Sequence, residues 1–169
     1  MAPGPHIVIA GLMAVGKTTT ARAIADELGR PIRDSDADLQ ALFGHTGREI
    51  AEELGVAELH RLESAVLLGS LAASEPTVIT PAAAVVEDAR VREALARRAL
   101  VGVLVAPLDV VFERMAAGTH RRAMDRGELE KLARRREQHF RDIADTVLDA
   151  TRPTAELAAE VLELARQQD

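Results

Sequence analysis

The stretch HIVIAGLMAVGKTTTARAIADEL, residues 6–28, decides the fold class of this chain. It opens with an apolar run, continues through a loop bounded by Gly11 and Gly16, and ends in an amphipathic helical pattern. The spacing of Gly11, Gly16, Lys17 and Thr18 matches the phosphate-binding loop (P-loop), and the strand before it and the helix after it are the context which that loop requires. The stretch therefore predicts a site for the phosphates of a nucleotide.

The residue types in this loop fit that chemistry. Glycine permits backbone angles that other residues resist, so successive N–H groups can turn toward phosphate oxygens. Lys17 adds a cation, Thr18 adds a hydroxyl for Mg²⁺, and the helix that begins near Lys17 points its positive end at the same phosphates. We expect the nucleotide to contact Gly11, Ala14, Val15, Gly16, Lys17, Thr18 and Thr19.

Length and composition limit the other possibilities. A chain of 169 residues suits one domain over residues 1–169, and a net charge of -6 argues against a general nucleic-acid binder. The absence of cysteine excludes disulfides and cysteine-bound zinc. No segment is apolar and long enough to span a membrane, and the N-terminus has no signal-peptide pattern, so we expect a cytoplasmic protein that does not bind membranes.

Short apolar segments alternate with helical patterns along the rest of the chain. The expected strands cover residues 6–10, 31–34, 77–80, 100–105 and 146–149. The expected helices cover residues 17–28, 57–73, 87–98, 108–117, 128–141 and 153–167. This alternation predicts an α/β fold of parallel β-α-β units, with a sheet between two layers of helices. Ligands of such sheets bind at the carboxyl ends of the strands.

Two aspartates follow the second expected strand. Asp34 would stand at the end of that strand and Asp36 at the start of the next helix, where it could also be the N-cap. Two acids beside a phosphate site can orient Mg²⁺ and accept the proton of an attacking hydroxyl. The third strand ends on Thr80 instead of an acid, so we expect Asp34 to serve the metal, and we place Glu87 and Asp88 in the first turn of the following helix.

Positive charge gathers between residues 114 and 141 of this acidic chain. The centre of that segment is polar and contains Gly118 and Gly127, which suits a mobile lid at about residues 118–127. Arginines in a lid can neutralise charge on a phosphoryl group during transfer, although about half of these arginines have an equally good explanation as a solvated helix face.

With these motifs, the chain resembles the shikimate kinases over essentially its whole length. The stretches that carry the resemblance are GLMAVGKTT, DSD, TGREIAEELGVAELHRLE, the spacing from Arg114 to Arg121, RREQHFRDIAD and TRPTAELAAEVL. The resemblance implies a five-stranded parallel sheet of the nucleoside-monophosphate-kinase type, a P-loop kinase fold with a lid, and a monomer. It also implies transfer of the γ-phosphoryl group of ATP, with Mg²⁺, to a hydroxyl of shikimate.

The resemblance assigns roles to individual residues. It implies that Lys17 and the lid residue Arg121 are catalytic and that Thr18 and Asp34 serve the metal. Asp36 would bind the acceptor hydroxyls and act as the base. The remaining assignments place Arg114, Arg152 and Pro153 against the adenine and Arg136 on the acceptor carboxylate.

Three departures from the family pattern fall mainly on the acceptor side. His60 stands where the family has an arginine that binds the substrate, with Arg61 one residue later, which on a helix is a rotation of about 100°. Ala82, Ala83 and Ala84 replace three glycines that line the substrate, and Arg122 replaces the proline after the lid arginine. We therefore expect His60, Arg61 and Ala82–Ala84 to define an altered acceptor site.

Several functions remain open at this point. The first is a small-molecule kinase for shikimate, and its variant is a kinase for another polyol, cyclitol or sugar acid. A different class is a nucleotide-binding protein without transfer activity, although Asp36 and Arg121 argue against it. A nucleoside-monophosphate kinase is a weaker option.

Overall fold

The computed structural model describes residues 4–118 and 124–168. Its centre is one parallel sheet with the strand order β2-β3-β1-β4-β5. The strands are β1 (His6–Gly11), β2 (Ile32–Asp34), β3 (Val78–Thr80), β4 (Ala99–Val105) and β5 (Thr146–Asp149). The predicted five-stranded parallel sheet is confirmed, including the short strand β2.

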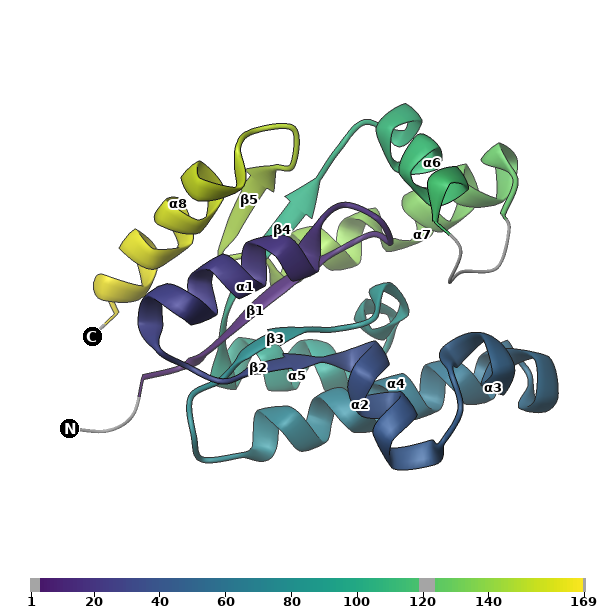
Figure 1. Cartoon of the computed structure of the whole chain (residues 1–169), viewed down its shortest axis with the longest axis horizontal. Helices are drawn as coiled ribbons and strands as arrows, with labels where there is room; N and C mark the ends of the chain where they lie inside the picture. Colours follow the sequence, from purple (N-terminus) through teal and green to yellow (C-terminus); the bar gives the residue numbers. More distant parts are fainter. Residues whose placement is uncertain (1–3, 119–123, 169) are drawn as a thin grey trace.

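Helices cover both faces of the sheet (Figure 1). The helices are α1 (Lys17–Leu28), α2 (Ser35–Phe43), α3 (Gly47–Leu54), α4 (Val56–Ala72), α5 (Ala89–Arg98), α6 (Leu108–Ala117), α7 (Arg126–Ile143) and α8 (Thr154–Arg166), with a 3₁₀ helix η1 (Ala83–Glu87). Helices α1 and α8 lie side by side on one face, while α4, α5 and α7 cover the other. The predicted three-layer α/β sandwich is therefore confirmed.

The alternation of side chains along β1 explains the two apolar layers. Ile7 and Ile9 point to the face covered by α1 and α8, whereas Val8 and Ala10 point to the face covered by α4, α5 and α7. All four are buried, so β1 is a central strand with an almost continuous apolar sequence.

Some helix boundaries differ from the predictions. The pattern predicts a helix near Asp36 but misses α3, which a capping box of Thr46 and Glu49 begins. The helix expected at residues 87–98 begins only at Ala89, because residues 83–87 form η1. Helix α7 begins at Arg126, earlier than predicted, so the C-terminal end of the predicted lid (118–127) is helical.

Candidate active site

The loop between β1 and α1 has the backbone that its glycines predict. Gly11 has φ +148°, and a Cβ there would lie 2.7 Å from the carbonyl oxygen of Leu104. Gly16 has φ +98°, and Ala14, with φ 60°, is the non-glycine residue with positive φ in the described part of the chain. The chain therefore turns tightly against β4 before it enters α1, as a P-loop requires.

Lys17 begins α1 and folds back over the loop. Its side chain is buried, and Nζ donates hydrogen bonds to the carbonyl oxygens of Gly11 at 3.0 Å and Leu12 at 3.1 Å. The first turn of α1 contains no acidic residue, so the positive end of the helix is not neutralised locally. The ammonium and the helix N-terminus thus lie at the same loop, where an anion is stabilised by both.

Asp34, the last residue of β2, connects the first turn of α1 to β3. Its Oδ2 accepts hydrogen bonds from the hydroxyls of Thr18 at 3.2 Å and Thr80 at 3.1 Å. Its Oδ1 accepts the backbone N–H groups of Asp36 and Ala37, which makes Asp34 the N-cap of α2. The expectation that Asp36 could be this N-cap is therefore wrong. Asp36 lies in the first turn of α2, and its side chain is exposed.

The oxygen ligands around Asp34 suit a hard cation. A carboxylate and two hydroxyls are the ligand type that Mg²⁺ prefers, and Mg²⁺ typically takes one or two protein carboxylates and completes its shell with phosphate and water. Within residues 4–118 and 124–168, no group of three or more His, Cys, Asp or Glu side chains could hold a metal by itself. Thr18 and Asp34 thus fit a metal that is bound together with phosphate.

A pocket of about 250 Å³ lies beside the loop. Its walls include Ala14–Gly16, Thr19, Arg114 and Arg152, so it gathers most of the residues predicted to hold the nucleotide. Arg114 donates to the carbonyl oxygen of Val15 at 3.2 Å and thereby ties α6 to the loop. Pro153 is the N-cap residue of α8 and follows Arg152 directly.

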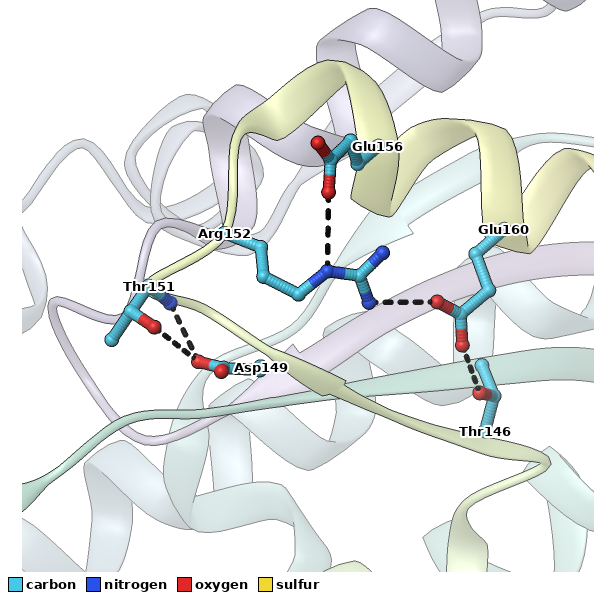
Figure 2. A network of polar contacts seen from close by, with 6 residues as sticks. All are labelled: Thr146, Asp149, Thr151, Arg152, Glu156 and Glu160. Carbon is cyan, nitrogen blue, oxygen red and sulfur yellow. Dashed lines mark hydrogen bonds and ion pairs between the residues drawn. The ribbon is translucent and has the colours of Figure 1, made fainter.

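Arg152 is held in place by carboxylates on α8 (Figure 2). Its Nε donates to Glu156 at 3.3 Å, and its Nη1 donates to Glu160 at 3.0 Å. Glu160 also accepts the hydroxyl of Thr146 at 3.2 Å, so the same carboxylate joins β5 and α8. The guanidinium is thus oriented at the pocket wall by its neighbours.

A second cluster, separate from the walls of this pocket, contains residues predicted to bind the acceptor. Arg136 on α7 is buried, with a side chain only 3% exposed, and its Nε donates to Glu87 at 2.7 Å. Arg135 donates from its Nε to the same carboxylate oxygen at 2.9 Å. Glu87 is the last residue of η1, the turn that also contains Ala83 and Ala84. Its placement in the first turn of α5 is therefore wrong, and Asp88 is the N-cap of that helix.

His60 belongs to this cluster, whereas Arg61 does not. His60 is half-buried on α4, and burial, followed by the charge of Arg136, lowers its pKa below the ordinary value. Arg61 is 61% exposed and makes an ion pair with Glu58 on its own helix. The rotation of one residue thus turns the side chain of Arg61 to solvent, so its role in binding the acceptor stays a prediction.

The remaining predicted residues are Ala82–Ala84, here called the alanine wall, and the arginines of the lid. Ala83 and Ala84 are buried, Ala82 is half-buried with φ -60°, and the three form part of an ordinary 3₁₀ turn. The positive φ values that the family glycines would permit are thus not used here. Arg121 and Arg122 lie outside the described residues, so their roles stay predictions.

Sequence reasoning missed Glu87 as a partner of Arg136. Burial raises the pKa of the Glu87 carboxyl, but hydrogen bonds from Arg136 and Arg135 offset this, and the pKa lies below its ordinary value. Glu87 is therefore ionised at neutral pH. The sequence carries no signal for this contact, because it depends on the end of η1 and on the rotation of α7.

A family model described as "Shikimate kinase" matches residues 13–166 of the chain. The chain belongs to the shikimate kinase family. Shikimate kinases are phosphotransferases that act on a hydroxyl group, and the P-loop, the five-stranded parallel sheet and the helical layers described above fit this family. The resemblance inferred from the motifs is confirmed.

Individual shikimate kinases show how far the likeness extends. The shikimate kinase of Mesorhizobium japonicum is 33% identical over 92% of this chain and 78% of its own length. That of Symbiobacterium thermophilum is 31% identical over 94% of both chains. The structure of shikimate kinase from Acinetobacter baumannii in complex with shikimate matches with a TM-score of 0.89 at 26% identity, over 98% of this chain and 95% of that one.

None of the helices within the described residues has the length and apolar character needed to cross a membrane.

Proposed function

We propose that this chain transfers the γ-phosphoryl group of ATP, with Mg²⁺, to a hydroxyl of shikimate or of a closely related hydroxylated acid. The buried guanidinium of Arg136 carries the acceptor part of the proposal, because a desolvated arginine is the residue best suited to bind a carboxylate. The close likeness to a structure that contains shikimate supports the same acceptor.

The donor side follows from the loop and its neighbours. The backbone N–H groups of residues 14–18, the positive end of α1 and the ammonium of Lys17 would bind the phosphates of ATP. Arg114 and Arg152, on the walls of the neighbouring pocket, would contact the adenine. Thr18 and Asp34 would hold Mg²⁺, which neutralises charge that develops on the transferring group.

The acceptor side uses Asp36, Arg136 and the alanine wall. The acceptor hydroxyl oxygen forms a bond to the γ-phosphorus, the bond from that phosphorus to the bridging oxygen breaks, and ADP leaves. The hydroxyl proton passes to Asp36, whose exposed carboxylate lies at the start of α2, two residues after Asp34. Arg136 orients the acceptor through its carboxylate, and Arg121 would stabilise the transferring group.

His60 and the alanines favour a second candidate. A neutral imidazole binds a carboxylate more weakly than the family arginine, and three methyl groups narrow the wall where the ring of the acceptor would lie. These features favour another polyol, cyclitol or sugar acid as the acceptor of the same reaction.

The deciding experiment measures ADP release from Mg·ATP with shikimate, quinate, gluconate, cyclitols and nucleoside monophosphates as acceptors. We expect turnover with shikimate that Lys17→Ala abolishes. Lys131→Ala is the matched control, because Lys131 is an exposed lysine on α7. Faster turnover with a neutral polyol would favour the second candidate. Tight ATP binding without turnover of any acceptor would contradict the enzyme and leave a nucleotide-binding protein.

We further infer that residues 1–169 act as a single domain and a monomer in the cytoplasm. This inference rests on the resemblance, and light scattering of the purified chain would test the monomer.

A further inference from the structure

The contact between Glu87 and Arg136 places a carboxylate of the protein where the acceptor carboxylate is expected. Glu87 Oε1 accepts the Nε–H of Arg136 at 2.7 Å, and Arg136 is the buried guanidinium on this side of the site. Arginine binds carboxylates with a planar fork of N–H groups in which Nε is one of the donors. One of these donors is thus already used by the chain itself.

This contact differs from the ordinary arginine pairs of the same helix. Arg141 and Glu137 are both exposed and four residues apart, so solvent screens their attraction. Arg136 is buried, and a buried charge without a partner is strongly unfavourable. An acceptor that displaces Glu87 must therefore supply a carboxylate of its own, while a neutral acceptor leaves the pair intact.

Arg135 gives Glu87 a second partner. It donates to the same Oε1 at 2.9 Å and is more than half exposed. Arg135 can therefore remain paired with the Glu87 carboxylate when Arg136 binds the carboxylate of an acceptor. The exchange therefore does not leave Glu87 as an unpaired charge.

His60 adds no second positive charge to compensate. Its imidazole is half-buried beside Arg136, and its lowered pKa leaves it neutral at neutral pH. The affinity of this cluster for an acceptor carboxylate thus depends on whether Arg136 pairs with the acceptor or with Glu87.

We propose that Glu87 is a specificity-determining residue that competes with the acceptor carboxylate for Arg136 and thereby shifts acceptor preference away from anionic compounds. The proposal rests on the proposed function in one respect, namely that the acceptor carboxylate binds at Arg136. It assigns to Glu87 an effect on acceptor affinity and none on ATP.

The test compares the binding of shikimate and of its neutral methyl ester by calorimetry, in the wild-type chain and in Glu87→Gln. We expect Glu87→Gln to bind shikimate about tenfold more tightly, the equivalent of one competing charge-assisted hydrogen bond, and the ester within about twofold. In turnover, the KM for shikimate falls by a similar factor while the KM for ATP is unchanged. Glu137→Gln removes a negative charge from the exposed face of α7 and should leave the affinity for both shikimate and the ester unchanged.

Two more variants separate competition from a structural role. Glu87→Asp keeps the charge but shortens the side chain, so we expect an intermediate gain, and this variant remains informative if Glu87→Gln does not fold. In the double variant Glu87→Gln/Arg136→Gln the gain for shikimate should vanish. The proposal is wrong if Glu87→Gln binds shikimate no more tightly than the wild type does. It is also wrong if this variant changes the affinities for shikimate and for the ester by the same factor.

The outcomes also distinguish this proposal from the proposed function. Shikimate turnover without the tightening in Glu87→Gln overturns the role of Glu87 and leaves the kinase intact. If Glu87→Gln binds shikimate more tightly but no variant turns it over, shikimate is not the acceptor, while the competition of Glu87 for Arg136 is supported. Absence of shikimate binding to both the wild type and Glu87→Gln overturns both.

Discussion

Asp34 and Thr80 stand opposite each other in the register of β2 and β3, and the hydroxyl of Thr80 donates to Asp34 Oδ2 at 3.1 Å. The same oxygen accepts the hydroxyl of Thr18, so a strand neighbour and a P-loop residue fix one carboxylate. The third strand ends on Thr80 instead of an acid, and its hydrogen bond positions the carboxylate that we propose for Mg²⁺.

Thr80→Val should lower kcat/KM by about tenfold to 100-fold, because it removes one of the two hydroxyl groups that hold the carboxylate we assign to Mg²⁺. Valine keeps the shape and removes the hydroxyl. We also expect a higher Mg²⁺ concentration for half-maximal turnover, which a magnesium titration at saturating ATP would measure.

Thr77→Val is the matched control for this change. Thr77 is buried directly before β3, the strand that ends on Thr80. Its hydroxyl donates to the backbone oxygen of Glu75 and not to Asp34. This variant should lose stability with its Mg²⁺ dependence unchanged. An equal shift in the Mg²⁺ titration of both variants would argue against the role of Thr80.

Arg61→Ala should change kcat/KM by no more than about twofold, because its guanidinium is exposed and paired with Glu58. Arg136→Gln, which removes the buried cation of the acceptor side, should lower kcat/KM about 100-fold or more. Steady-state kinetics with shikimate at saturating Mg·ATP would compare the two. A large increase in the shikimate KM of Arg61→Ala would show that α4 rotates when the acceptor binds.

The strands and most of the helices could be predicted from local patterns, although α3 was missed. The apolar runs at residues 6–10 and 100–105 and the helical spacing between them determine the order of strands and helices, and the P-loop spacing determines where the ligand end of the sheet lies. Each of these signals is carried by neighbouring residues. The exact start of α5 was not predictable, because η1 takes the residues before it.

The acceptor side could be predicted only in part. Position in the family pattern marks His60 and Arg136, but the pair of Glu87 and Arg136 joins residues 49 positions apart. The side to which Arg61 points depends on the rotation of α4. Contacts of this kind follow from packing, which the sequence does not encode locally.

Glu160→Gln should raise the KM for ATP about fivefold, because Arg152 would lose one of the two carboxylates that orient it at the pocket wall (Figure 2). The KM for the acceptor should stay constant. Glu163→Gln is the matched control on α8, since Glu163 pairs with Arg166 near the end of that helix. Equal effects of the two variants on the KM for ATP would contradict a specific role of Glu160.

His60 should make the folded state less stable as the pH falls below neutrality. In the unfolded chain the imidazole takes up a proton at its ordinary pKa of about 6.5. In the folded chain burial and the charges of Arg136 and Arg135 lower the pKa, although Glu87 partly opposes them. Between these two pKa values the unfolded state binds more protons, so the free energy of unfolding falls with falling pH.

The variant His60→Gln removes this titration. Urea unfolding at pH 8, 7, 6 and 5.5 should show that the wild type loses more stability below pH 7 than the variant does. Between pH 8 and 7, above both pKa values, the difference between the two chains should be constant, and this offset accounts for any change in packing. Parallel stability curves down to pH 5.5 would mean that the imidazole is protonated equally in the folded and unfolded chains. The imidazole of His60 would then add a positive charge beside Arg136 in mildly acidic solution.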